Sequence, residues 1–326
     1  MKLGVYITGA CGTSKKLYKA RNEAKRGRGT HQAVLEQIEQ DSLSLIETQE
    51  NKGFSFIVDP QYSFYDLLQP ITENVEGVSS GPQENWFNNN VFYIRPQIQG
   101  PLKDKVGSFL EKYIHSNRLI QNKSAMAILP SPYTLLKLSD VSGYQNDSEA
   151  IRDLAKLLRE EAKNLVKKGF TRIQFDEPTI VMKQSLDSVK KEDIELLKEG
   201  INEIGKIQGA TISLHTYFGD AGPLLSVFEE LPVDCIGIDC TETRMSDILK
   251  HKFSGKEIAL GLINSRTPAM EDPKDIIQKL QKVSDNTDAK QIWLTPNTGL
   301  EFIGWTLGHD KLSILEEVKR GFEKNV

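Results

Sequence analysis

The sequence contains few cysteines and no long apolar run. Its three cysteines (Cys11, Cys235 and Cys240) cannot all pair with one another, so a disulfide framework is not indicated. The apolar run within residues 1–7 is too short for a signal peptide or a membrane-spanning helix, and no later run is long enough to cross a bilayer. We therefore expect a soluble cytoplasmic protein without a membrane partner.

The sequence also lacks a strong excess of charge of either sign. Its 326 residues include 41 lysines and arginines against 45 aspartates and glutamates, a formal net charge of -4. This mild acidity guarantees no basic face and argues against a nucleic-acid partner. Neither a Walker phosphate loop nor a dinucleotide glycine fingerprint is present, and no low-complexity linker divides the chain.

Eight short apolar stretches have the character of β-strands, and helical stretches separate them. The predicted strands cover residues 3–7, 54–58, 125–129, 172–175, 211–214, 235–238, 258–262 and 291–294. Two of the predicted helices cover residues 30–52 and 147–168, the second capped by Asp147 and Ser148. This alternation predicts an α/β fold, a single (β/α)8 TIM barrel over residues 1–326. We expect residues 62–100, which are rich in aromatic rings, to be an irregular insertion over one mouth of the barrel.

Polar side chains follow the predicted strands at the points where the strands end. In a barrel of parallel strands these ends converge on one mouth, where catalytic groups gather. We therefore predict a site there, with Asp176, Glu177 and His215 as candidate catalytic residues. The other polar residues at strand ends are Asp239, Asn264, Asn297 and Thr298.

His215 leaves several chemical roles open. With nearby carboxylates it could hold a metal, orient a substrate amine or serve acid–base catalysis, and a lone histidine is as often a hydrogen-bonded structural residue. A zinc site normally uses thiolates or several imidazoles. Cys235 and Cys240 are separated by an odd number of positions, so a regular strand points them to opposite faces. They are a poor chelating pair.

A basic segment follows the first predicted strand. Between residues 15 and 28 it contains seven lysines and arginines and the single acid Glu23. A solvated helix face is one interpretation, and attraction for a polyanionic ligand or partner is the other.

Several dispersed motifs resemble the cobalamin-independent methionine synthase family, and the resemblance covers nearly the whole chain. Residues 173–178, Ile-Gln-Phe-Asp-Glu-Pro, are similar to the family's Q-I-D-E-P signature. Residues 86–93 resemble W-F-x-T-N-Y-H-Y, residues 63–66 resemble F-S-x-Y-D, and residues 129–134 resemble the G-P-x-T strand end. Residues 216–219, Thr-Tyr-Phe-Gly, look like the zinc-free N-terminal barrel of the long members. The implied fold is a barrel of the methionine synthase and uroporphyrinogen decarboxylase type.

The resemblance implies a metal site from which this sequence departs. The catalytic barrel of the family binds zinc through His-x-Cys, a glutamate and a distant cysteine. His215 matches the histidine and Asp239 stands at the glutamate, which makes these two the candidate metal ligands. Tyr217 stands at the first cysteine and Thr298 at the second. Zinc in the family activates a homocysteine thiol, so the loss of both thiolates removes most of the soft ligands.

The resemblance also implies a function, methyl transfer to homocysteine in methionine biosynthesis. The methyl donor would be methyltetrahydrofolate or a methyl-carrying corrinoid protein. Asp176 matches the carboxylate that holds the amino group of homocysteine, and Lys15 stands at the arginine of the N-terminal signature. The predicted substrate-binding residues are Asp176, Asp239, Asn297, Thr298 and Lys15.

Two further hypotheses belong to different classes. One is a non-catalytic, zinc-free subunit that docks on a separate zinc-bearing barrel chain. The other is an enzyme of the same superfamily that acts without metal on another substrate. Fold alone does not separate these possibilities.

Overall fold

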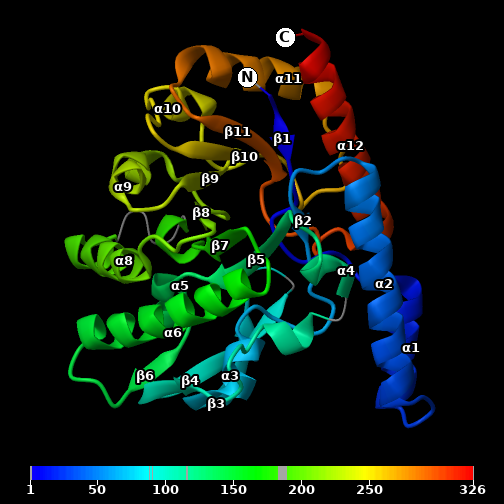
Figure 1. Cartoon of the computed structure of the whole chain (residues 1–326), viewed down its shortest axis with the longest axis vertical. Coiled ribbons are helices and arrows are strands. Elements are labelled where there is room, and N and C mark those ends of the chain that lie inside the picture. The colour runs from blue at the N-terminus through cyan, green and yellow to red at the C-terminus, as the bar shows by residue number, and fades with distance from the viewer. Residues whose placement is uncertain (1, 88, 90, 115–116, 183–188, 326) are drawn as a thin grey trace.

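Eight parallel strands form one sheet that curls into a barrel (Figure 1). The structure is a computed structural model that describes residues 2–87, 89, 91–114, 117–182 and 189–325. Along the sheet the strands are β1 (Gly4–Val5), β11 (Gln291–Pro296), β10 (Glu257–Ile263), β9 (Cys235–Asp239), β8 (Thr211–His215), β7 (Arg172–Asp176), β5 (Ala125–Pro130) and β2 (Ile57–Val58). These are the eight strands predicted from the sequence, with shifted ends, and the predicted fold is confirmed.

The barrel closes at a seam between β1 and the start of β2. The amide of Ser55 donates to the carbonyl of Val5 at 2.7 Å, and the amide of Val5 donates to Oγ of Ser55 at 3.2 Å. These hydrogen bonds join the two edge strands of the sheet. The carboxyl ends of all eight strands therefore surround one mouth.

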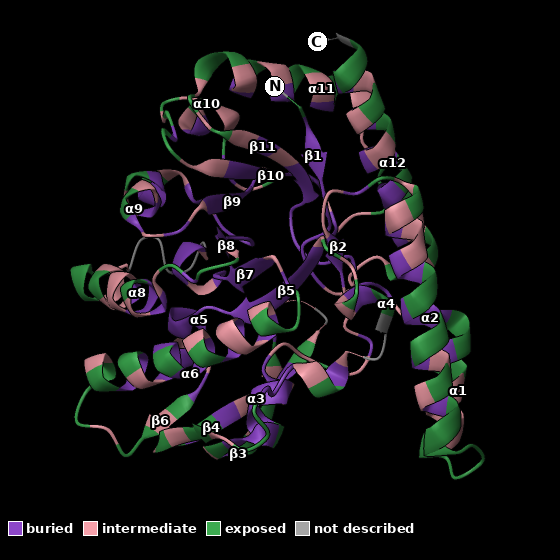
Figure 2. Cartoon of the chain, viewed as in Figure 1, coloured by how far each residue is buried: buried purple, intermediate pink, exposed green. Residues whose placement is uncertain are grey.

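Helices pack around the outside of the barrel, and burial follows this arrangement. In Figure 2 the strands of the barrel are almost entirely buried, whereas the helices are buried on one side and exposed on the other. No helix in the described part of the chain is long and apolar enough to cross a membrane. The helices are α1 (Lys15–Lys25), α2 (His31–Asn51), α3 (Gln69–Asn74), α4 (Asn117–Ile120), α5 (Pro132–Lys137), α6 (Asp147–Lys167), α8 (Lys191–Ile204), α9 (Leu225–Glu230), α10 (Met245–Ile248), α11 (Pro273–Asn286) and α12 (Gly304–Asn325).

Capping side chains fix where the long helices begin. Oγ1 of Thr30 accepts from the amide of Ala33 at 3.1 Å at the start of α2, which confirms the predicted helix. The cap of α6 is Asn146, whose Oδ1 accepts from the amide of Glu149 at 2.9 Å. The predicted capping role of Asp147 was wrong by one position, because Asp147 is already the first helical residue.

The aromatic insertion is ordered, and the prediction that residues 62–100 are irregular was wrong. Strands β3 (Val75–Asn85) and β4 (Phe92–Asp104) form a long antiparallel hairpin, to which β6 (Asp140–Ser142) adds a third strand. The register of the hairpin shifts between Glu76 and Val78 and again between Ser80 and Gln83. These irregularities accommodate the glycines and the proline that made the segment look like a loop.

A buried arginine fills the amino-terminal end of the barrel. The Arg172 guanidinium lies 4.7 Å from the ring centre of Phe56, 5.0 Å from that of Trp293 and 5.4 Å from that of Tyr6. Both of its terminal nitrogens donate to Oε2 of Glu257 at 2.9 Å. This packed layer is a solid floor beneath the mouth.

Candidate functional site

A cavity of about 250 Å³ lies at the carboxyl-terminal mouth of the barrel. Loops after β1, β2, β8 and β11 contribute to its wall, together with the end of β7, α1 and the tip of the β3–β4 hairpin. Its lining includes Cys11, Arg21, Trp86, Asp176, Tyr217, Thr298 and Glu301. The site predicted at this end of the strands therefore coincides with a cavity.

Asp176 lies at the end of β7 and reaches this cavity. Its Oδ1 accepts from Nε2 of Gln174 at 2.8 Å, and its Oδ2 lies 3.3 Å from the hydroxyl of Tyr217, which donates to it. Nε2 of Gln174 also donates to the carbonyl of Thr8 at 3.1 Å, which fixes the amide. Burial raises the pKa of the Asp176 carboxyl well above its usual range.

The neighbouring Glu177 points away from the cavity. Its carboxylate accepts hydrogen bonds from the hydroxyl of Ser131, from the amide of Thr134 at 3.2 Å and from the amide of Ile180 at 2.9 Å. Burial raises the pKa of Glu177 to about 7. Glu177 therefore ties the end of β7 to the start of α5, and it does not line the cavity.

His215 lies at the end of β8 behind the cavity wall. Its Nε2 donates to the carbonyl of Asn297 at 3.1 Å, whereas Nδ1 is buried without a partner in the described residues. A side chain at position 237 would meet this ring, because a Cβ built on Gly237 would lie 1.9 Å from Nδ1. Burial lowers the pKa of His215 to about 4, so the imidazole is neutral at pH 7.

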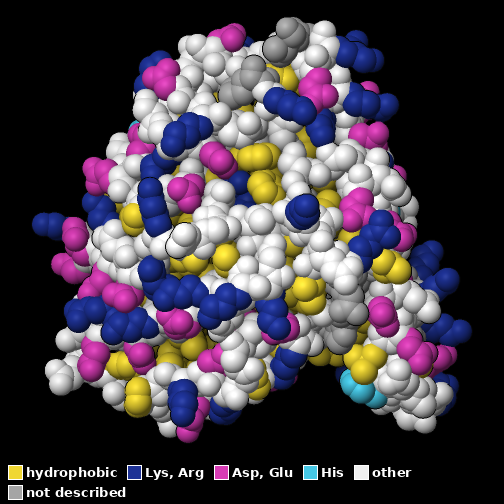
Figure 3. Space-filling model, viewed as in Figure 1, with side chains coloured by type: hydrophobic (Ala, Val, Ile, Leu, Met, Phe, Trp, Pro, Cys, Tyr) yellow, Lys and Arg dark blue, Asp and Glu magenta, His cyan; other side chains and the backbone are white. Residues whose placement is uncertain are grey.

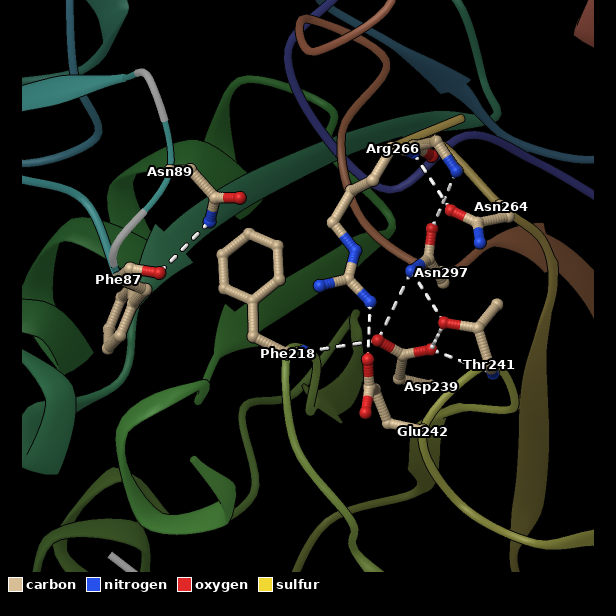
Figure 4. Close-up of polar contacts among 10 residues, drawn as sticks. Phe87, Asn89, Phe218, Asp239, Thr241, Glu242, Asn264, Arg266 and Asn297 are labelled. Atoms are coloured by element: carbon tan, nitrogen blue, oxygen red, sulfur yellow. Dashed lines mark hydrogen bonds and ion pairs between the residues drawn. The ribbon is translucent and has the colours of Figure 1, made fainter. Parts of the chain in front are cut away.

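Asp239, at the end of β9, has its carboxylate enclosed by donors. It accepts from the amide of Phe218 at 3.1 Å and from the amide and hydroxyl of Thr241 at 2.9 and 2.7 Å. Nδ2 of Asn297 donates to it at 3.2 Å (Figure 4). The carbonyl of Asn297 accepts from His215, so Asn297 connects Asp239 with His215. These contacts position the loop after β8, and Asp239 does not line the cavity.

Phe218, in that loop, anchors the hairpin over the mouth. It has a positive φ of 68°, and its ring lies 5.8 Å from the ring of Phe87 at the hairpin tip. The Arg266 guanidinium lies 5.4 Å from the same ring and donates to Glu242 at 2.6 Å (Figure 4). The neighbouring Trp86 lines the cavity, so these contacts hold an aromatic cover over it.

The donor set at this mouth does not fit the zinc site of the family. Nε2 of His215 is engaged with a carbonyl, and the oxygens of Asp239 accept four hydrogen bonds. Tyr217 and Thr298 supply no thiolate. In the described part of the chain, no three side chains of His, Cys, Asp or Glu are grouped to hold a metal ion. We therefore assign no chemical step to zinc.

Of the remaining predicted residues, Thr298 lines the cavity, whereas Asn264 and Lys15 do not. Thr298 lines the cavity, and its carbonyl accepts from Oγ of Ser265 at 2.8 Å. Asn264 accepts from the amide of Arg266 at 2.9 Å, outside the cavity lining. Lys15 is exposed at the start of α1 and does not reach the cavity.

The cavity lining includes residues that were not predicted as site residues, among them Glu301, Arg21 and Trp86. Arg21 belongs to the basic segment, and it donates to the carbonyl of Tyr62. Trp86 belongs to a motif already noted for its resemblance. Glu301 follows Thr298 by three positions, but no feature of its local sequence points to a buried side chain.

The fold and the cavity define a class: an α/β barrel with a cavity at the carboxyl ends of its strands. The family model described as "Cobalamin-independent synthase, N-terminal domain" matches residues 74–288. The chain therefore belongs to the cobalamin-independent methionine synthase family.

Its relatives are distant but cover most of the chain. The methionine synthase of Saccharolobus solfataricus is 22% identical over 299 residues, which is 90% of this chain and 87% of that protein. The putative vitamin-B12 independent methionine synthase of Listeria monocytogenes is 20% identical, with a TM-score of 0.77 over 100% of this chain and 99% of that one. The B12-independent methionine synthase of Shewanella sp. W3-18-1, solved in complex with selenomethionine, is 18% identical, with a TM-score of 0.72 over 91% of each chain.

Proposed function

We propose that the cavity binds homocysteine and that the protein acts in methyl transfer to its sulfur in methionine biosynthesis. The observation that carries this proposal is Asp176, a buried carboxylate in the cavity that no cation pairs with in the described residues. A buried carboxylate without a counter-charge favours a ligand that brings one. The α-ammonium group of an amino acid meets this requirement.

The cavity also contains one side chain suited to the other end of an amino acid. Arg21 is the cation among the described residues that line it, and its guanidinium lies 5.5 Å from the ring centre of Tyr65. A guanidinium can pair with an α-carboxylate in a bidentate manner. We therefore place the two charged groups of the amino acid between Asp176 and Arg21, beneath Trp86.

For the methyl donor we propose methyltetrahydrofolate, bound in a groove that adjoins the cavity. This groove has a volume of about 860 Å³ and shares Arg21, Tyr62, Phe64 and Tyr65 with the cavity. Its other lining residues include two lysines, Lys25 and Lys112, and two tyrosines, Tyr18 and Tyr113. Rings can stack on a pterin and cations can pair with a glutamyl tail. A methyl-carrying corrinoid protein is the alternative donor.

A second candidate function is a binding subunit without catalysis of its own. It is favoured by Tyr217 and Thr298 at the positions of the two zinc thiolates, and by the match to a model of the N-terminal domain. In this case a separate zinc-bearing barrel chain supplies the thiol-activating metal, and this chain contributes binding surface.

The two functions are separated by an assay of methionine formation from homocysteine with each donor, run with the protein alone and with a separate zinc-bearing barrel. Turnover by the chain alone supports methyl transfer within this barrel. Turnover that appears only with the added barrel supports the subunit. Absence of turnover in both assays, together with no homocysteine binding in calorimetry, would overturn both. Zinc analysis of the same preparations tests our assignment of the donor set, since zinc bound stoichiometrically to the chain alone would contradict it.

A further inference from the structure

Glu301 is a second carboxylate of the cavity, and nothing in the family resemblance assigns it a role. It follows β11 in a loop that is fixed at both sides: the amide of Leu300 donates to the carbonyl of Ala10 at 2.7 Å, and the carbonyl of Thr298 accepts from Ser265. Oε2 of Glu301 is buried without a hydrogen-bond partner in the described residues.

The neighbouring backbone leaves room for this carboxylate. A Cβ built on Gly299 would lie 2.0 Å from Oε2 of Glu301, so only glycine at position 299 allows the observed placement. Gly299 and Glu301 both line the cavity. The loop after β11 therefore presents to the cavity a carboxylate whose Oε2 has no hydrogen-bond partner in the described residues.

The groups that face Glu301 from the other elements share its preference for the neutral state. Cys11 after β1, Asp176 at the end of β7 and Tyr217 after β8 each have a pKa raised by burial and, in addition, by the negative charge of Glu301. Burial raises the pKa of Glu301 itself to about 8. Arg21 and Asp66 are the other charged side chains of the cavity lining in the described residues.

We propose that Glu301 is a second ligand-binding carboxylate, which loses its proton when an ammonium group enters the cavity and pairs with that group beside Asp176. An opposite charge within a buried site favours the ionised carboxylate, so the proton leaves as the ammonium group binds. The proposal depends on the proposed function only for the identity of the ligand as an amino acid.

The proposal predicts proton release on binding and an affinity that depends on pH. Between pH 6 and 8 the affinity for an ammonium ligand rises, because the fraction of ligand-free protein in which Glu301 is protonated falls. Above the pKa of free Glu301 this contribution levels off. One linked proton gives at most about a tenfold rise in affinity per pH unit.

The test is titration calorimetry of the whole chain with L-methionine in buffers of different ionisation enthalpy. Methionine is preferred to homocysteine because its thioether does not titrate. We expect the Glu301→Gln variant to release about one proton fewer than the wild type at pH 7 and to bind about tenfold more weakly at pH 8. Glu317→Gln, an exposed position on α12, is the matched control and should behave as the wild type. Circular dichroism verifies that each variant is folded.

A second probe, the propylammonium ion, separates this proposal from the proposed function. Methionine binding with equal proton release in the wild type and Glu301→Gln overturns the role of Glu301 and leaves the proposed function standing. Binding of propylammonium but not methionine, with proton release that depends on Glu301, supports the role of Glu301 and overturns the amino-acid ligand. Binding of neither probe overturns both.

Discussion

The hydroxyl of Tyr217 lies 3.3 Å from Oδ2 of Asp176. By the family resemblance, Tyr217 stands at the position of a zinc-binding cysteine. This donor favours the ionised carboxylate against the effect of burial. In this chain, the position that holds a metal ligand in the zinc barrel therefore supports the group that we propose for the substrate amine.

Replacement of Tyr217 by phenylalanine removes that donor. We expect the affinity for methionine at pH 7 to fall by about threefold to tenfold, because the pKa of Asp176 rises further when the hydrogen bond is lost. Calorimetry measures the effect. Tyr133→Phe is the control, since the hydroxyl of Tyr133 donates at 2.9 Å to Asp193 outside the cavity. Equal affinities of the two variants would contradict the role of Tyr217.

Replacement of Asp176 by asparagine tests the amine-binding role directly. The amide retains the shape of the side chain and an acceptor for Gln174, so the barrel should stay folded with a thermal midpoint within about 2 °C of the wild type. Methionine binding should weaken by more than about tenfold, because the counter-charge is lost. The exposed Asp275→Asn on α11 serves as the control. Unchanged affinity for methionine would remove Asp176 from the proposed site.

Glu177 should affect stability through its ionisation. Its folded-state pKa of about 7 lies above the usual glutamate value, so the folded state binds the extra proton and the resulting stabilisation is lost as the pH rises. We expect the free energy of unfolding of the wild type to fall relative to Glu177→Gln by up to about 1.4 kcal/mol per pH unit between pH 5 and 7. Urea denaturation across this range measures the difference. A difference that stays constant or grows with pH would show that Glu177 is ionised in the folded protein.

The contact between Phe87 and Phe218 should govern how tightly the hairpin covers the cavity. Phe87→Ala removes the ring contacts of Phe87 with Phe218 and with Trp86 and leaves the base of the hairpin intact. We expect faster hydrogen exchange at Trp86 and at least about a threefold faster release of ligand. Phe92→Ala, at a 47% exposed position of the same hairpin, is the matched control. If both variants exchange alike, Phe87 is not the anchor.

Arg172 should matter for stability out of proportion to a surface cation. Arg172→Met leaves Glu257 without its ion pair in a partly buried layer, and we expect a loss of about 3 kcal/mol in the free energy of unfolding. Arg152→Met removes an exposed pair with Glu199 and should cost less than about 1 kcal/mol. Chemical denaturation compares the two variants. Similar losses would mean that the aromatic rings alone hold this layer together.

The sequence predicted the barrel because the determinants of its strands are local. Short apolar runs between helical segments define the eight strands, and a parallel barrel brings their carboxyl ends together. That reasoning placed Asp176 and Thr298 in the cavity lining. It could not separate Asp176 from Glu177, because their opposite orientations depend on contacts that Ser131 and Thr134 make from another strand end.

The hairpin and the position of Glu301 could not be predicted from the sequence, because both depend on structure that the local sequence does not reveal. The hairpin contains glycine and proline at its register shifts, which locally resemble a loop. The position of Glu301 at the cavity depends on a loop joined to the backbone near Ala10, almost 300 positions earlier. The surface was easier to anticipate: Lys and Arg side chains are interspersed with Asp and Glu over the face in Figure 3, as the near-balanced composition suggests.

The packed layer of Arg172 and its three aromatic rings closes the amino-terminal end of the barrel. A ligand of the cavity would therefore enter and leave by the mouth, which α1 and the hairpin tip border. Under the proposed function, product release and substrate entry would share this route, and the contact between Phe87 and Phe218 would control their rate.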